Sequence, residues 1–105
     1  HIELARWPDL VLVAPATANI ISSVANGLAA DLAQTLLMAT TKQIVFAPSM
    51  NVRMWENKLF QKNIDTLISN GYEFLGPTEG EMACGEFGMG RMMEPQQIFQ
   101  SLVTK

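Results

Sequence analysis

Residues 9–20 read DLVLVAPATANI, and this stretch decides the fold class. Its first part is a run of valine and leucine that stops at Pro15, a pattern typical of a strand buried on both faces of a parallel sheet. The second part predicts a helix that begins after Thr17, as its N-cap, and stops at Gly27. A buried strand that leads directly into a helix indicates an α/β fold.

The same succession recurs further along the chain. QIVFAP at 43–48 predicts a second buried strand, and NKLFQKNIDTLISNG at 57–71 predicts an amphipathic helix with Asn57 as a possible cap. We also expect a buried helix at 28–40, a short strand at 72–76, a long glycine-containing loop at 77–95 and a closing helix at 96–105. This alternation predicts a parallel sheet in which ligands bind beyond the carboxyl ends of the strands.

Composition limits the chain to one small domain with a core, since 49% of its 105 residues are hydrophobic and 16% are charged. The net charge of -3 and the scattered basic residues argue against a nucleic-acid partner. We expect neither a membrane span nor a secretory leader. One cysteine and one histidine do not make the usual zinc site, and a lone cysteine fits a reducing cytoplasm.

The start of the chain predicts that it is a piece of a longer polypeptide. Residues 1–4 read HIEL, without an initiator methionine, and look like the middle of a helix or loop. Only three strands are visible, whereas a doubly wound domain usually has about five or six. We therefore expect the first strands of the domain to lie upstream of His1.

The segment PSMNVRMW at 48–55 carries more chemistry than a strand-to-helix turn requires. The Asn51 side chain both donates and accepts, and methionines on either side suit a soft lining around an aromatic ligand. Alternatively, Asn51 is only a helix cap. The APATAN segment offers the same choice, because Thr17 and Asn19 either donate to a ligand or simply begin a helix.

Two more residues have reactive side chains. Cys84, in the segment ACGEFGMGRMM, could donate a proton, because a thiol with a pKa near 8.5 is protonated at neutral pH. Otherwise it is a small residue of a structural loop. His1 could be a general base or merely an exposed terminal residue. The glycines around Cys84 match neither a dinucleotide fingerprint nor a P-loop, and they suit a hinged cover over a ligand.

Four stretches, in order along the chain, resemble the flavin-containing cysteine decarboxylases: HIELARWPD, APATANIISSVANGLAADL, PSMNVRMW and ACGEFGMGRMMEP. The resemblance extends over residues 1 to 95 and is strongest to the branch that acts on phosphopantothenoylcysteine in coenzyme A biosynthesis. It implies a flavodoxin-like (Rossmann-like) three-layer α/β fold with a parallel sheet, bound FMN, and a homotrimer or an assembly of trimers. It also implies that the FMN phosphate loop lies upstream and that a phosphopantothenate-cysteine ligase is fused or separate.

The resemblance further implies a role for each matched residue. Catalysis falls on His1, Asn51 and Cys84, flavin contacts on Thr17, Ala18, Asn19, Ile20 and Ser49, and substrate contacts on Asn51, Met54, Ala83 and Met92. In the implied reaction FMN takes a hydride from the substrate cysteine, CO₂ leaves, and the hydride returns together with a proton from Cys84. Two alternatives stay open: a peptidyl-cysteine decarboxylase that stops at the enethiol, and a non-catalytic regulatory member of the family.

Overall fold

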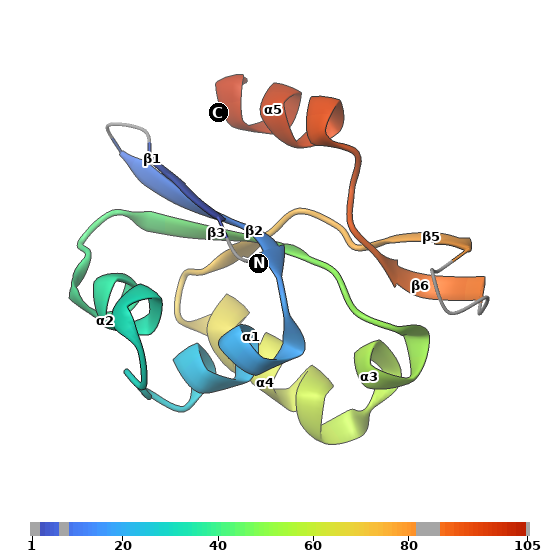
Figure 1. Cartoon of the computed structure of the whole chain (residues 1–105), viewed down its shortest axis with the longest axis horizontal. Coiled ribbons are helices and arrows are strands. Elements are labelled where there is room, and N and C mark those ends of the chain that lie inside the picture. The colour runs from blue at the N-terminus through green and yellow to red at the C-terminus, as the bar shows by residue number, and fades with distance from the viewer. Residues whose placement is uncertain (1–2, 7–8, 82–86, 105) are drawn as a thin grey trace.

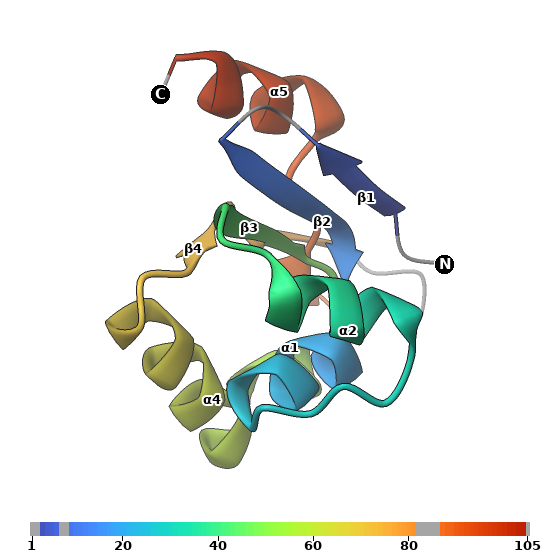
Figure 2. The same cartoon turned by 90° about the vertical axis from the view of Figure 1, so that its left-hand side faces the viewer.

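The computed structural model describes residues 3–6, 9–81 and 87–104. A four-stranded sheet in the order β1-β2-β3-β4 forms its centre (Figures 1 and 2). Its strands are β1 Glu3–Arg6, β2 Leu10–Ala16, β3 Gln43–Pro48 and β4 Glu73–Phe74. The last three are parallel, which confirms the predicted α/β sheet, while β1 runs antiparallel to β2.

Helices cover both faces of this sheet. The helices α1 Ala18–Ala25, α2 Leu32–Ala39 and α4 Lys58–Ser69 lie on one face and α5 Pro95–Val103 on the other (Figure 1). The strands supply each core by alternation: Val13 and Phe46 face the first group, whereas Leu12 and Val45 face α5. Phe46 is fully buried and stacks on Tyr72 and Phe74. The predicted three layers are therefore present.

Two predictions about local structure were wrong, and one short helix was missed. Residues 3–4 belong to the antiparallel strand β1, not to a helix or loop. The supposed loop 77–95 contains the antiparallel pair β5 Thr78–Glu81 and β6 Phe87–Arg91. Its sequences, TEGE and FGMGR, are short and rich in glycine and charge, so they lack the β-branched alternation that reveals strands. The short helix α3 Val52–Glu56 was missed as well.

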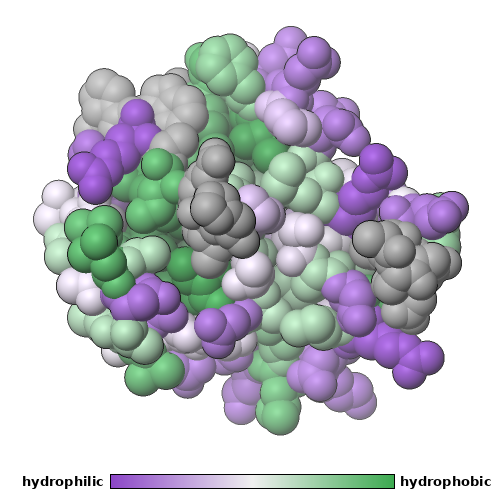
Figure 3. All heavy atoms as spheres, viewed as in Figure 1, coloured by the Kyte–Doolittle hydropathy of each residue, from purple (hydrophilic) through white to green (hydrophobic). Residues whose placement is uncertain are grey.

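The helix expected to be buried at 28–40 is shorter and partly exposed. It begins after its N-cap Asp31, and only Gln34 and Leu37 of its residues are buried. Leu32 and Met38 remain 75% and 55% exposed, and apolar side chains are visible over α2 in Figure 3. Although its sequence is apolar, this helix is therefore not buried in the core. None of the helices in the described ranges has the length and apolar character needed to cross a bilayer.

Candidate functional site

The segments that follow β2 and β3 lie side by side. Ala16, the last residue of β2, pairs with Pro48 at the end of β3, and the Ser49 N–H donates to the Ala16 carbonyl at 3.0 Å. A register shift between Val13 and Ala16 interrupts the ladder just before this point. APATAN and PSMN therefore meet at the carboxyl edge of the sheet, where the sequence predicts that ligands bind.

Thr17 begins α1 as predicted. Its Oγ1 accepts a hydrogen bond from the Ile20 N–H at 3.3 Å, so the hydroxyl hydrogen remains to donate elsewhere. Thr17 and Ala18 are half-buried and Asn19 is exposed. The Ile20 side chain is only 2% exposed and packs in the core beneath α1, so the flavin contact predicted for Ile20 does not involve its side chain.

Asn51 is the N-cap of α3, and this role fixes its side chain. Its Oδ1 accepts from the Met54 N–H at 2.9 Å. Because the oxygen is committed to the helix, the Nδ2 group is left as a pure hydrogen-bond donor toward a ligand. The cap and the ligand contact, which the sequence presented as alternatives, are therefore compatible in the same residue.

These loops line one open cavity of about 340 Å³, which we call the carboxyl-end cavity. Its lining residues are Ala18, Asn51, Arg53, Met54, Asn57 and Phe60. The cavity brings a predicted flavin contact, Ala18, together with two predicted substrate contacts, Asn51 and Met54. Sequence reasoning missed Arg53 and Phe60 as site residues and noticed Asn57 only as a cap. Nothing in the spacing of these residues signals that they share a cavity.

The β5–β6 hairpin packs against α3. The Met50 N–H donates to the Gly90 carbonyl at 2.9 Å, which ties β6 to the segment that carries Asn51. Gly88 has φ +151, and a Cβ built on it would lie 2.7 Å from Val52 Cγ2. Only glycine fits this approach without a shift of β6 or of Val52. Strand β6 is thereby held against α3, the helix that Asn51 begins.

The remaining predicted site residues are divided between two situations. His1, Ala83 and Cys84 lie outside the described residues, and their assigned roles stay predictions. Met92 is half-buried against the core cluster on the α5 face and does not line the carboxyl-end cavity. Ser49 is half-buried beside Ala16.

Within the described ranges, no group of three or more His, Cys, Asp or Glu side chains is placed to hold a metal ion.

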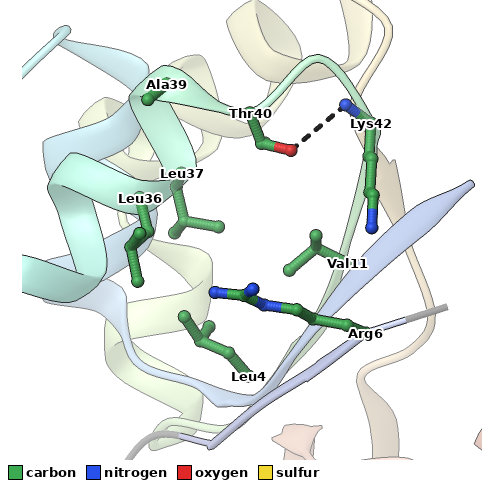
Figure 4. A pocket seen from close by; sticks show the side chains of 8 residues that line it. All are labelled: Leu4, Arg6, Val11, Leu36, Leu37, Ala39, Thr40 and Lys42. Carbon is green, nitrogen blue, oxygen red and sulfur yellow. Dashed lines mark hydrogen bonds between the residues drawn. The ribbon is translucent and has the colours of Figure 1, made fainter. Parts of the chain in front are cut away.

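A second cavity, of about 240 Å³, lies at the amino end of the same strands, and we call it the amino-end cavity (Figure 4). Leucines of α2 and β1 form much of its wall, and Arg6 and Lys42 supply two cations. In Figure 4 the Arg6 side chain extends across the cavity toward α2, and the Lys42 N–H donates to Thr40 Oγ1 at 3.2 Å. None of the predicted site residues that the structure describes lines it.

The carboxyl-edge geometry agrees with the comparisons to known proteins. A family model described as Flavoprotein matches residues 1–105. The chain belongs to the flavoprotein family. It is 51% identical over 98 residues to a coenzyme A biosynthesis bifunctional protein CoaBC of Vibrio cholerae, covering 93% of this chain and 25% of the relative. The CoaBC protein of Bacillus subtilis is 48% identical over 98 residues, with 93% and 24% of the two chains covered. The flavoprotein chain thus spans about a quarter of the length of these relatives.

Solved structures share the fold of this flavoprotein. A PPC decarboxylase variant with cysteine replaced by serine, complexed with pantothenoylaminoethenethiol, superposes with a TM-score of 0.87 at 32% identity. That match covers 94% of this chain and 56% of the other. The FMN binding protein AtHal3 gives 0.81 at 33% identity, covering 94% and 55%. These neighbours confirm the flavodoxin-like fold.

Proposed function

We propose that this chain forms, over residues 1–105, the C-terminal portion of an FMN-dependent decarboxylase domain. The substrate is 4′-phosphopantothenoylcysteine, and the product is 4′-phosphopantetheine in coenzyme A biosynthesis. The observation that carries the proposal is the carboxyl-end cavity, which Ala18, Asn51 and Met54 line together. Support comes from the CoaBC relatives and from the neighbour solved with pantothenoylaminoethenethiol.

The residues beside α1 fit one side of a flavin. Ala18 has a small side chain that lets a flat ring approach the backbone, and the Thr17 hydroxyl keeps a hydrogen to donate to a ring carbonyl. Thr17, Ala18, Asn19, the Ile20 backbone and Ser49 are the residues that would hold FMN. When bound, FMN supplies the hydride acceptor and donor that a simple cysteine carboxylate lacks.

Asn51 would hold the carboxylate that leaves as CO₂. The bond from the Met54 N–H fixes its Oδ1, so the Nδ2 group is the part of the side chain left to donate to the substrate. Met54 and Phe60 provide apolar walls on the same cavity. A donor fixed at one end of the carboxylate orients the bond that breaks, and this orientation is the main contribution that we assign to Asn51.

Proton transfer is assigned to the two residues outside the described ranges, His1 as the base and Cys84 as the acid. Two structural neighbours support this assignment by residue type. The PPC decarboxylase complexed with pantothenoylaminoethenethiol carries a cysteine-to-serine substitution, and EpiD complexed with the substrate peptide DSYTC carries a histidine-to-asparagine substitution. EpiD has a TM-score of 0.75 at 32% identity and 55% of its chain covered.

Replacing Cys84 by serine in the full-length protein tests the proposed function. The wild type should release a product that is lighter than the substrate by CO₂ alone. Serine is a far weaker acid than a thiol, so Cys84→Ser should release a product that is lighter by CO₂ and two further hydrogens. Mass spectrometry after an anaerobic turnover distinguishes the two products. No product from the wild type would favour the non-catalytic alternative, and an oxidised product from the wild type would favour the peptide decarboxylase.

We also propose that the full-length protein is a homotrimer or an assembly of trimers in the cytoplasm, with a ligase domain fused to it as the bifunctional relatives suggest. The exposed Leu32 and Met38 of α2, at 75% and 55%, support burial against another part of the assembly. Light scattering of the purified full-length protein would measure the number of subunits. A monomer would overturn the proposed assembly and leave the proposed chemistry untouched.

A further inference from the structure

We infer that Asn57 is a further substrate-binding residue, which donates to the substrate's carboxylate together with Asn51. This inference rests on the proposed function. The two asparagines stand at the two ends of α3, and both line the carboxyl-end cavity. Neither sequence pattern nor resemblance had placed Asn57 in the site.

Asn57 is held by the backbone on both sides. Its Oδ1 accepts from the Phe60 N–H at 3.0 Å as the N-cap of α4, and its own N–H donates to the Met54 carbonyl at 3.3 Å as the C-cap of α3. As with Asn51, the side-chain oxygen is thus committed to a helix, and the Nδ2 group is the part left to donate. The cavity therefore presents two fixed amide donors.

The corner between α3 and α4 keeps these donors in place. Trp55 is half-buried and packs edge-on against Phe60, with ring centroids 6.1 Å apart. The Gln61 side chain donates to the Trp55 carbonyl across the same corner. A rigid corner fixes the separation of Asn51 and Asn57, which suits recognition of one small, planar group.

The described lining residues suit a carboxylate. They are two asparagines, Arg53 and three apolar side chains, and none of them is itself a carboxylate that would repel the substrate's. A carboxylate has two oxygens and about four lone-pair sites, so it can accept from Asn51 and Asn57 at once. Of the substrate's groups, the carboxylate is the one already assigned to Asn51, so we assign its second oxygen to Asn57, the other asparagine that lines the same cavity.

Two substitutions that retain the helix cap distinguish a substrate-binding role of Asn57 from a structural one. Serine caps a helix as well as asparagine does, so Asn57→Ser should leave the melting temperature unchanged. It removes the Nδ2 donor to a charged acceptor and should raise the KM for the substrate by roughly tenfold or more, with a smaller change in kcat. Asn57→Asp keeps the cap, adds a negative charge and should raise KM further.

Product inhibition supplies the decisive measurement, because 4′-phosphopantetheine lacks the carboxylate. Asn57→Ser should leave the product's inhibition constant at the wild-type value. The matched control is Gln96→Glu, which makes the same charge change as Asn57→Asp at an exposed position in the first turn of α5. An unchanged KM in both Asn57 variants, or an equal loss of product binding, would overturn the inference. A wild type that does not turn over would instead refute the proposed function.

Discussion

The carboxyl-end and amino-end cavities lie at opposite ends of the same strands and differ in how their polar groups are held. In the first, the side-chain oxygens of Asn51 and Asn57 are bonded to backbone N–H groups at 2.9 Å and 3.0 Å. In the second, the charges belong to Arg6 and Lys42, two exposed residues with long, rotatable stems. Holding such stems in one geometry costs rotamer entropy, whereas the asparagines are ordered before a ligand arrives.

This comparison shows that a cavity with charged lining residues is not enough to identify the functional site. Among the described lining residues the amino-end cavity has two cations and the carboxyl-end cavity has one, yet none of the described site residues lines the amino-end cavity. The carboxyl-end cavity is distinguished by short side chains whose orientation the fold determines. The following predictions test this difference, each in the full-length protein.

The largest effect is expected from Asn51→Asp. The new carboxylate can still accept from the Met54 N–H, so α3 should keep its cap and the protein its melting temperature. The outward donor is lost and a negative charge faces the substrate's carboxylate, so product formation should fall by roughly a thousandfold or more. FMN absorbance of the purified variant should match that of the wild type. Turnover at the normal rate would show that the carboxyl-end cavity is not where the carboxylate binds.

A smaller effect is expected from Gly88→Ala, which tests the packing of the hairpin on α3. The added Cβ would lie 2.7 Å from Val52 Cγ2 at a φ of +151, so β6 must move. Overpacking and backbone strain should cost about 1–3 kcal/mol of unfolding free energy, and we expect activity to fall about tenfold.

The double variant Gly88→Ala/Val52→Ala provides the control, because it removes the methyl groups that collide. It should regain part of the lost stability and activity, as a thermodynamic cycle of the two substitutions would show. Strictly additive losses would mean that this contact does not position the hairpin.

Thr17→Ala should have a more modest effect. Loss of the Oγ1 acceptor for the Ile20 N–H should lower the unfolding free energy by about 1 kcal/mol. Loss of the hydroxyl donor should weaken FMN binding several-fold, by about 0.5–1.5 kcal/mol, in a fluorescence titration. Thr17→Ser keeps both functions and should restore both values. If Thr17→Ala altered stability alone, the hydroxyl would be only a helix cap.

The elements and site residues that could be predicted from the sequence are those determined by residues close together in the chain. The buried strands 9–16 and 43–48 were foreseen because continuous apolar runs mark strands covered on both faces, and their parallel pairing placed Thr17 and Asn51 at one edge. The caps Thr17 and Asn57 were foreseen because each directly precedes a predicted helix, whereas the Asn51 cap was one of two open alternatives.

The elements that were missed depend on contacts between distant residues. Strands β5 and β6 are stabilised by pairing with each other and by contacts with the α3 segment, such as the bond from the Met50 N–H to the Gly90 carbonyl. Local strand propensity contributes little to them. Exposure of Leu32 could not be foreseen either, because an apolar residue looks the same in sequence whether it meets its own core or a surface. That Asn57 lines the cavity could not be foreseen either, because it depends on the angle between α3 and α4, and residue spacing does not encode that angle.

The smallest effect is expected from Arg6→Gln, in the amino-end cavity. The Arg6 side chain is exposed and extends over leucines of α2, so its replacement by a neutral side chain of similar reach keeps much of the apolar contact (Figure 4). The unfolding free energy should change by no more than about 0.5 kcal/mol, and kcat/KM should stay within about twofold of the wild type. Steady-state assays at low and moderate salt separate a local role from general attraction of an anionic substrate, since only the latter weakens as salt is added. A tenfold loss of kcat/KM that persists at moderate salt would mean that a flexible cation does contribute to the site, and that fixed short donors are not what distinguishes the two cavities.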